Sequence, residues 1–447
     1  MNINGIINGF SKMSKEEKLK LVAGFFDSPE KVLKELKSYW HSDPKKQTLF
    51  DEFSENTLSN FYFPFGIAPN FLINGKNYMV PMVIEESSVI AAASSSAKFW
   101  AERGGFHAEV VSSEKLGQVH FIWKGNPDKL ERSMPDLKKA LLEGTRNITS
   151  NMEKRGGGIL DVELIKMVDK IEDYYQLKVS FETVDSMGAN FINSVLEEFA
   201  RILKEFLVNS PLFEGDEKDC EIIMSILSNY TPDCLVRAWV ECDVKDLNLG
   251  EGDMEQEKFV WKFQKAIEIA KVDEYRAATH NKGIFNGIDA IALATGNDFR
   301  AIEAGAHTYA CRSGKYQSLT DLTIENDVFH YELKVPLAMG TVGGLTSLHP
   351  MARFSLEMLG SPNAKELMMI AASAGLANNF GAVKSLVTKG IQVGHMKMHL
   401  FNILNFYAAT QEEKQKAVEY FKSRKVSFKS VTDFINNHRS HPLGVKS

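Results

Sequence analysis

One stretch, residues 275–307, constrains the fold of this chain more than any other, because it combines a long apolar run with a lysine and an aspartate. It reads YRAATHNKGIFNGIDAIALATGNDFRAIEAGAH. The Ala, Ile and Leu residues predict a buried segment, and a buried charge is costly unless it is paired. We therefore expect Lys282 and Asp298 to pair. A lysine beside a carboxylate can hold an oxyanion in an active site, or the two can form a structural ion pair in a helical core.

Glycines divide this stretch in the sequence-based interpretation. Gly283, directly after Lys282, and Gly296 both predict breaks in the chain. Asp298 follows the second break and is expected to begin a helix over residues 298–310. A helix N-terminus favours the ionised form of such an aspartate.

Length and composition indicate an ordinary globular protein. The chain has 447 residues, which predicts two to three domains, with 44% apolar and 25% charged residues. The net charge of −6 gives no sign of a nucleic-acid surface. Four widely spaced cysteines without zinc-ligand spacing favour free thiols in a reducing compartment. We see no signal peptide and no apolar run long enough to span a membrane, so we expect a cytoplasmic protein.

The N-terminal residues 1–50 are typical of charged, amphipathic helices. Ser14 and Glu17 form a capping-box pattern, and Pro29 stands where the first turn of a second helix is expected. We interpret this region as a packing or oligomer surface.

An aromatic, β-branched region follows at residues 61–84. Asn74-Gly75 stands between two strand-like runs and predicts a tight hairpin turn. A helix rich in Ala and Ser is then expected from Ser87 or Ser88. Glu86, just before it, is either a carboxylate stabilised by the helix dipole or a catalytic acid beside a ligand.

Alternating patterns predict a small second domain. Residues 119–124 and 177–183 alternate apolar and polar side chains, which is typical of an antiparallel sheet with one wet face. Helices are expected over 137–143 and 192–207. Mixed strands and helices suggest a ferredoxin-like α+β domain inserted in the larger one, to which a strand at 233–244 returns.

DSMGAN, residues 185–190, lies between a predicted strand and a long helix of this small domain. A glycine there lets a phosphate approach the helix N-terminus, although an ordinary Asp cap with a glycine turn explains the same residues. It is not the GxGxxG pattern, so a Rossmann fold is not expected. The triple glycine 156–158, flanked by Lys154 and Arg155, is either a flexible basic loop or a phosphate contact.

Towards the C-terminus, Gly340, Gly343 and Gly344 form a second glycine cluster, either for close approach to a ligand or for tight helix packing. A helix over 364–388 is expected to end at Lys389-Gly390. His395 and His399 are one helical turn apart, but no third ligand is evident, so we expect an acid–base histidine rather than a metal site. Residues 410–447 resemble a mobile helical tail that can act as a lid.

Six sequence blocks together resemble one enzyme family. They are GIAPNFLINGKNYMVPMVIEESSVIAAAS, DSMGAN, YRAATHNKGIFNGI, ATGNDFRAIEAGAHTYACRSG, GTVGGLTSLHP and GIQVGHMKMH. In this order, over about Glu55 to His399, they resemble the soluble bacterial and archaeal class of 3-hydroxy-3-methylglutaryl-CoA (HMG-CoA) reductase.

The resemblance assigns roles position by position. It implies that the catalytic residues are Glu86, Lys282, Asp298 and His395. It implies that Ser88, Asn229, Arg276 and Asn286 contact the hydroxymethylglutaryl group or organise the site. It implies that Asp185, Met187, Gly188 and Asn190 form the nicotinamide-dinucleotide loop.

Two positions depart from the family pattern. Ser87 stands where relatives usually have proline, which implies a looser helix start beside Glu86. Thr149 stands where an NADH-preferring member carries an acidic residue. With no acid to hold a free ribose hydroxyl, and with Arg146, Lys154 and Arg155 nearby, a 2′-phosphate is acceptable, so we favour NADPH over NADH.

The resemblance also implies an architecture and a reaction. We expect an α+β fold with a mostly helical CoA- and substrate-binding domain (1–110 and 229–389), a small NAD(P)-binding domain (111–228) and a C-terminal flap (390–447). A homodimer with the active site between subunits would reduce HMG-CoA to mevalonate and CoA in two hydride transfers, with no nucleic-acid or membrane partner.

The alternatives are the reverse reaction in mevalonate degradation, a non-redox CoA-thioester lyase or transferase that uses Lys282 and His395, and an inactive CoA-binding paralogue. The DSMGAN loop argues against the lyase or transferase, and the four intact catalytic positions argue against the inactive paralogue.

Overall fold

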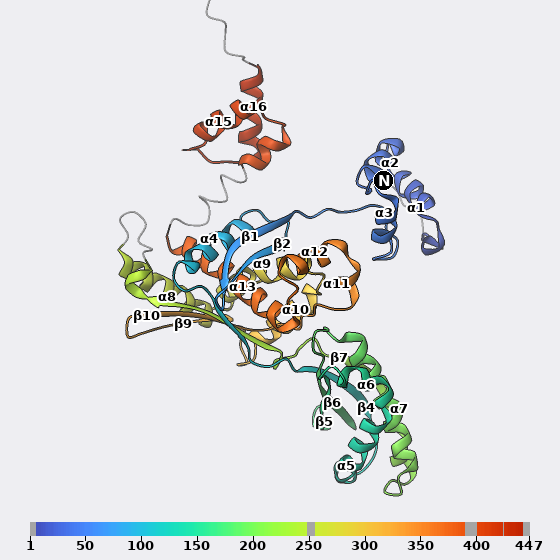
Figure 1. Ribbon diagram of the computed structural model, residues 1–447. Coiled ribbons are helices and arrows are strands. Elements are labelled where there is room, and N and C mark those ends of the chain that lie inside the picture. Colours follow the sequence, from blue (N-terminus) through green and yellow to red (C-terminus); the bar gives the residue numbers. More distant parts are fainter. Residues whose placement is uncertain (1–5, 248–254, 389–399, 423, 441–447) are drawn as a thin grey trace, which may run out of the picture. The chain divides into compact units, whose positions relative to one another are not determined.

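The computed structural model describes residues 6–247, 255–388, 400–422 and 424–440 (Figure 1). The chain divides into two compact units, Met1–Pro64 and Phe65–Ser447. The secondary structure is mixed helix and strand throughout the second unit. No described helix is long and apolar enough to cross a bilayer.

The N-terminal unit is helical. Its elements are η1 (Phe10–Lys12), α1 (Lys15–Ala23), α2 (Pro29–Ser38) and α3 (Pro44–Asp51). The predicted capping box is confirmed: Glu17 N donates to Ser14 Oγ, and Ser14 N donates to the Glu17 carboxylate. Pro29 occupies the first turn of α2, as expected. An ion pair of 2.7 Å between Lys15 and Asp51 ties α1 to α3.

The second unit begins with the predicted hairpin, β1 (Phe65–Ile73) and β2 (Lys76–Val83). Asn74 and Gly75 connect the strands with φ values of 49° and 79°. Positive φ at both positions is what a two-residue hairpin turn requires, and Asn-Gly adopts it at low cost. Helix α4 (Val89–Ala101) packs on β1.

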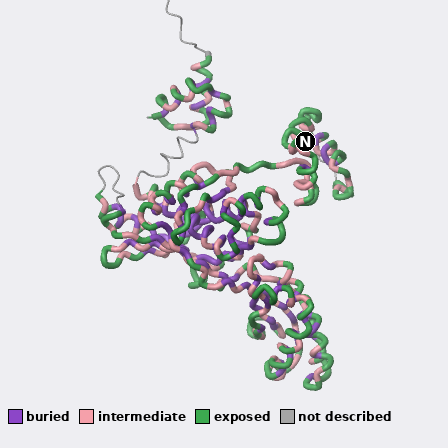
Figure 2. Tube along the Cα trace, in the orientation of Figure 1, coloured by how far each residue is buried: buried purple, intermediate pink, exposed green. Residues whose placement is uncertain are grey.

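A four-stranded antiparallel sheet in the order β3-β8-β10-β9 follows, from β3 (His107–Val110), β8 (Leu235–Asp243), β9 (Thr320–Glu325) and β10 (Val328–Pro336). β8 confirms the strand predicted at 233–244, and its first six residues alternate between partly and fully buried. Helix α13 (Ala364–Val387) packs on β8 and on α9 (Glu274–Ala294). These elements share one large hydrophobic core (Figure 2).

The break predicted at Gly283 is wrong, because α9 continues through it without interruption. A Cβ at Gly287 would lie 2.5 Å from the carbonyl oxygen of Ala374 in α13, and Gly283 faces Asn379 and Ala382 of the same helix. Gly287 therefore allows two buried helices to approach closely, whereas a Cβ at Gly283 would make only ordinary van der Waals contact with α13.

The third sheet has the order β5-β6-β4-β7, with every neighbouring pair antiparallel. Along the chain its elements are β4 (Lys115–Ile122), α5 (Pro127–Gly144), α6 (Arg146–Glu153), β5 (Gly158–Lys166), β6 (Tyr174–Glu182), α7 (Ala189–Asn209), η2 (Gly215–Lys218) and β7 (Glu221–Leu227). The predicted alternating strands and both predicted helices are confirmed. This sheet and its helices have a hydrophobic core of their own.

The remaining described elements are η3 (Val244–Asp246), α8 (Gln256–Val272), α10 (Phe299–Ala310), α11 (Gly344–Leu348), α12 (Pro350–Met358), α15 (Gln411–Tyr420) and α16 (Phe428–Ser440). Residues 400–406 are also helical. The predicted helix at 364–388 is confirmed as α13, whereas its predicted end at Lys389-Gly390 lies outside the described residues.

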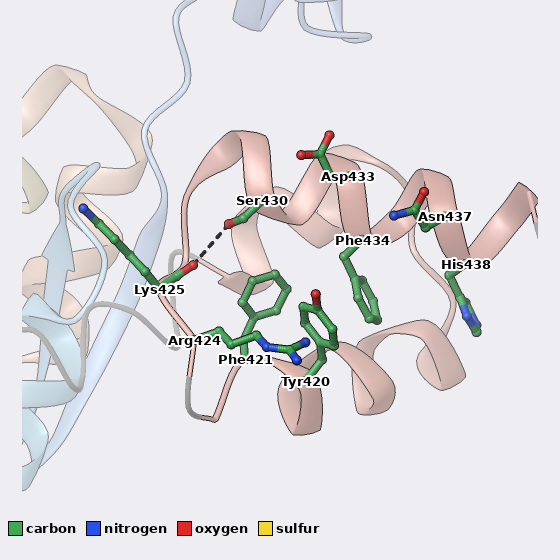
Figure 3. Close-up of a pocket in the computed structure, with 9 residues that line it drawn as sticks. All are labelled: Tyr420, Phe421, Arg424, Lys425, Ser430, Asp433, Phe434, Asn437 and His438. Atoms are coloured by element: carbon green, nitrogen blue, oxygen red, sulfur yellow. Dashed lines mark hydrogen bonds between the residues drawn. The ribbon is translucent and has the colours of Figure 1, made fainter.

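The C-terminal helices form a third, small core. A surface hollow of about 430 Å³ lies beside it. Figure 3 shows the rings of Tyr420, Phe421 and Phe434 gathered between α15 and α16. The Arg424 guanidinium lies 3.8 Å from the centre of the Tyr420 ring. In Figure 3 the Lys425 and Asp433 side chains point away from these rings, whereas Arg424, Ser430, Asn437 and His438 also line the hollow.

Candidate active site

Lys282 and Glu86 form the centre of the site. The Lys282 ammonium lies 2.5 Å from the Glu86 carboxylate, and the two side chains are 60% and 37% exposed. Lys282 comes from the middle of α9, and Glu86 from the segment just before α4. On α9 the neighbouring residues Asn281 and Gly283 are buried, so Lys282 lies on the helix face that is open to solvent.

The expectation that Lys282 is buried and paired with Asp298 is wrong for this structure. Asp298 is the N-cap of α10, as predicted, and accepts backbone hydrogen bonds from Arg300 and Ala301. Its ion-pair partner is the Arg300 guanidinium, at 3.0 Å. The sequence motif places Asp298 at the N-terminus of α10. Arg300, only two residues further along the chain, pairs with it locally, so no cation from another element is needed.

Asp298 is held in its ionised form. Partial burial acts to raise its pKa. The hydrogen bond from the Arg300 guanidinium and those from the backbone N–H groups together lower the pKa by more than burial raises it, so the pKa lies below the ordinary value. The predicted preference of this helix N-terminus for a charged aspartate therefore agrees with the geometry.

A hollow of about 150 Å³ lies beside Glu86. Predicted site residues Glu86, Ser88 and Asn286 line it together with residues of α4 and α13. Asn286 is one helical turn beyond Lys282, so both lie on the same face of α9. From α13, Asn378 also lines the hollow, and the sequence analysis missed it. An Asn-Asn pair inside an Ala-rich buried helix was the signal that could have revealed it.

Ser88 has an unusual backbone. It precedes α4 with φ 78° and ψ −16°, in the left-handed region, and its side chain makes no capping hydrogen bond. A non-glycine residue pays a steric penalty there, and such strain gathers at functional sites. Ser88 lines the hollow beside Glu86, and its hydroxyl does not cap the helix.

Arg276 lies in the first turn of α9 and is half-buried. Burial lowers the pKa of its guanidinium. In the described part of the chain this guanidinium forms no ion pair with a carboxylate, although a buried cation calls for one. Its environment therefore suits an anionic ligand.

His280, from the same predicted stretch, has a structural role. It is 1% exposed, and its Nε2 lies 2.6 Å from Thr320 Oγ1. Burial lowers its pKa to about 3, so the ring is neutral at physiological pH.

The predicted cofactor loop joins β6 to α7. Gly188 is the N-cap of α7 with φ 91°, and a Cβ there would lie 2.5 Å from the Thr183 side chain. Asp185 does act as a helix cap, but for a distant helix: its Oδ1 accepts from Ala364 N, in the first turn of α13. Met187 and Asn229 line the same small cavity. Asn229, a predicted substrate residue, therefore lies beside the cofactor loop and not among the residues that line the Glu86 hollow.

Both glycine clusters lie against this loop. A Cβ at Gly340 would lie 2.5 Å from Met187 N, and one at Gly157 would lie 2.5 Å from the carbonyl oxygen of Glu182. Gly340 therefore allows close packing of protein on protein, and the triple glycine is a tight turn between α6 and β5. Lys154 and Arg155 beside it are exposed.

Thr149 is 1% exposed on α6, and its hydroxyl has no hydrogen-bond partner among the described residues. The side chain points into the protein, so position 149 presents neither an acid nor a hydroxyl at the surface. Asn190 lies exposed in the first turn of α7.

The predicted acid–base histidine, His395, and its neighbour His399 lie outside the described residues. Among the residues that are described, no three His, Cys, Asp or Glu side chains gather as metal ligands.

Known proteins resemble this chain over most of its length. The family model for hydroxymethylglutaryl-coenzyme A reductase matches residues 15–400. The 3-hydroxy-3-methylglutaryl-coenzyme A reductase of Archaeoglobus fulgidus is 37% identical over 415 residues, which cover 92% of this chain and 90% of that protein.

Solved structures from Streptococcus pneumoniae are similar too. A class II 3-hydroxy-3-methylglutaryl-CoA reductase bound to NADPH in open conformations is 39% identical, with a TM-score of 0.70, and the match covers 85% of this chain and 99% of that one. A second structure of the enzyme is 37% identical, with a TM-score of 0.71 and coverage of 96% and 99%.

Proposed function

The chain belongs to the hydroxymethylglutaryl-coenzyme A reductase family, and we propose that it reduces HMG-CoA to mevalonate and CoA at the site centred on Lys282 and Glu86. As a member of that family it is an oxidoreductase. The observation that carries the residue assignment is the 2.5 Å contact between Lys282 and Glu86, because it joins a cation and an acid from distant segments beside a hollow. The same groups serve the reverse reaction, the oxidation of mevalonate.

Lys282 holds the thioester oxygen as it becomes an oxyanion. A fixed ammonium directed at the position where negative charge develops stabilises the transition state more than the ground state. Glu86 keeps the ammonium in place before substrate binds. Asp298, ionised at the start of α10, adds a negative charge to the site, and exchange of Arg300 for Lys282 as its partner would link the three catalytic groups.

Reduction of a thioester to an alcohol needs two hydrides. NADPH, when bound, supplies one hydride in each of two steps. After the first, the tetrahedral adduct collapses to the aldehyde, and His395 protonates the departing CoA thiolate. During the second hydride transfer Lys282 again polarises the carbonyl, and Glu86, which must take up a proton before this step, then gives that proton to the alkoxide. Each step thus adds one hydride and one proton.

In this proposal Ser88, Arg276 and Asn286 bind the hydroxymethylglutaryl group, and Asn229, which lines the cavity beside Met187, organises the site next to the cofactor loop. Arg276 is the partner of its free carboxylate, which is supported by the half-buried guanidinium that no carboxylate of the described chain neutralises. Ser88 and Asn286 provide hydroxyl and amide groups in the hollow beside Glu86.

The cofactor binds at the start of α7, on Asp185, Met187, Gly188 and Asn190. The left-handed Gly188 leaves the helix N-terminus without a side-chain cap, which suits a phosphate. We propose NADPH as the preferred form, since Thr149 supplies no acid for a free ribose hydroxyl while Lys154 and Arg155 are exposed near the triple glycine.

We further propose the domain organisation. The small domain, residues 111–228, is ferredoxin-like, which is supported by its strand–helix–strand–strand–helix–strand order and by the sheet order β5-β6-β4-β7. Residues 1–110 and 229–389 form the CoA- and substrate-binding domain, and residues 390–447 a flap that carries His395. The working unit is a homodimer with the site between subunits. Free cysteines support a cytoplasmic location.

The test measures NADPH and NADH oxidation by absorbance with HMG-CoA, together with titration of the CoA thiol released in the same sample. We expect two cofactors oxidised per thiol, and faster oxidation of NADPH. Thiol release without cofactor oxidation would overturn the reductase and favour a non-redox CoA-thioester lyase or transferase. No turnover of any kind by folded protein would also overturn it.

A further inference from the structure

A buried lysine, Lys115, supports the loop between β6 and α7. It begins β4 and is 4% exposed. Its ammonium donates to Thr183 Oγ1 at 2.6 Å and to the carbonyl oxygen of Ser186 at 3.4 Å. It forms no ion pair with a carboxylate of the described residues. A buried ammonium with only neutral partners is costly, and an apolar side chain of similar length would pack there without that cost.

The loop that Lys115 contacts is strained. Val184 has φ 53°, which a β-branched side chain rarely adopts. The turn is held from both sides of this residue: Val184 N donates to the Glu182 carboxylate at 2.8 Å, and Thr183 Oγ1 donates to Ser186 O at 2.6 Å. Lys115 therefore contacts both ends of the second hydrogen bond.

Beyond the turn, the loop is packed tightly. Gly188 N donates to Ser186 Oγ at 3.1 Å, which places the last residue of the turn against the start of α7. Thr341 N donates to the carbonyl oxygen of Asp185 at 2.8 Å. Lys115, Met187 and Asn229 line the same small cavity of about 10 Å³. We therefore expect a change at Lys115 to reach Gly188 through Thr183 and Ser186.

We propose that Lys115 is a positioning residue for the nicotinamide cofactor. The buried ammonium of Lys115 holds the strained turn at residues 183–186 and so fixes the start of α7. This inference rests on the proposed function, because it assumes that NADPH binds this loop. Lys115 does not contact the reacting atoms. It acts through Thr183 and Ser186, and its removal lets the turn relax out of the geometry that the cofactor needs.

The first experiment compares Lys115→Met with wild type in the full-length protein. NADPH affinity is measured by fluorescence titration, and KM and kcat by turnover of HMG-CoA. We expect the dissociation constant and KM for NADPH to rise about tenfold, as for loss of a charge-assisted hydrogen bond, while KM for HMG-CoA stays within about threefold. Lys178→Met, on the exposed side of β6, is the matched control and should leave all these values unchanged.

Thr183 provides a second variant pair, should Lys115→Met fail to fold. Thr183→Val removes the hydroxyl that accepts from Lys115 and should weaken NADPH binding in the same way, whereas Thr183→Ser keeps the hydroxyl and should bind nearly as wild type. Equal NADPH affinities for the Val and Ser variants would contradict the proposal.

Rescue separates positioning from general destabilisation. Glycine at position 184 accepts the positive φ without strain, so Val184→Gly added to Lys115→Met should restore most of the NADPH affinity. A double variant that binds NADPH as weakly as Lys115→Met would overturn the positioning role of Lys115. Unchanged NADPH affinity in Lys115→Met itself would overturn it too. Wild-type turnover reports separately on the proposed function, since the titration measures NADPH binding whether or not HMG-CoA is reduced.

Discussion

The Lys282 ammonium lies 2.5 Å from the Glu86 carboxylate, although 196 positions separate the two residues in the sequence. Both side chains are partly exposed, so solvent screens their attraction and the contact contributes little to the stability of the fold. An exposed, close pair beside a hollow is the arrangement that the proposed function requires, with the acid keeping the cation in place for the substrate.

Glu86→Gln tests the acid of this pair. The amide keeps the shape of the side chain but supplies no proton, so we expect kcat for mevaldehyde reduction to fall by about 100-fold or more, with NADPH affinity unchanged. Steady-state kinetics with mevaldehyde and with HMG-CoA measure the effect. Glu85→Gln is the neighbouring exposed control, and similar kinetics for the two variants would contradict the role of Glu86.

Ser88→Gly should separate backbone strain from side-chain function. Glycine adopts φ 78° freely, so this variant should be more stable than Ser88→Ala by about 1 kcal/mol, as judged by thermal denaturation. Both variants lose the hydroxyl and should lose activity to a similar extent. If Ser88→Ala proved as stable as Ser88→Gly, the backbone at this position would not be strained.

Asp289 should make stability depend on pH. Its Oδ1 is buried without a hydrogen-bond partner among the described residues, and burial together with the neighbouring carboxylate of Glu303 raises its pKa to about 8 from the ordinary 3.8. The folded protein keeps this proton while the unfolded chain releases it above pH 4. The contribution of Asp289 to stability is therefore greatest at low pH and is lost as pH rises towards 8, by up to about 1.4 kcal/mol per pH unit for one proton.

Asp289→Asn removes this titration. Thermal denaturation midpoints from pH 5 to 8.5 should fall less steeply in the variant than in wild type, and Glu303→Gln should flatten the curve in part. Asp433→Asn, an exposed residue of α16, is the control and should follow wild type. Parallel curves for wild type and Asp289→Asn would show that this carboxyl does not keep its proton.

Arg155→Glu tests the cofactor preference. Arg155 is exposed at the triple-glycine turn, where a guanidinium can pair with a 2′-phosphate. Reversal of its charge should raise KM for NADPH about tenfold and leave KM for NADH nearly unchanged. Lys170→Glu, an exposed lysine of the same small domain, should change neither value. An equal effect of Arg155→Glu on both cofactors would exclude a phosphate contact.

Local patterns in the sequence predicted local structure well. The Ser14–Glu17 cap, the Asn74-Gly75 turn and the Asp298 helix start depend on neighbours within a few residues, and each is present. Periodicity likewise predicted β4 and β6, because one face of each strand must be buried.

Tertiary contacts could not be predicted in the same way. Gly283 has a low helix propensity, yet α9 continues through it and packs along its length against α13. Asp185 is an expected cap for its own helix, but it accepts from Ala364 of α13 instead. The partner of Lys282 likewise depends on where the segment before α4 lies, which no pattern within residues 275–307 encodes.

Lys282→Met tests whether the Lys282 ammonium stabilises the oxyanion. Single-turnover reduction of HMG-CoA by NADPH should slow by at least about 100-fold, because the developing oxyanion loses its cation, while HMG-CoA affinity changes little. Lys258→Met, an exposed lysine on α8, should react as wild type. A Lys282→Met protein that reduces HMG-CoA within about threefold of the wild-type rate would contradict the account.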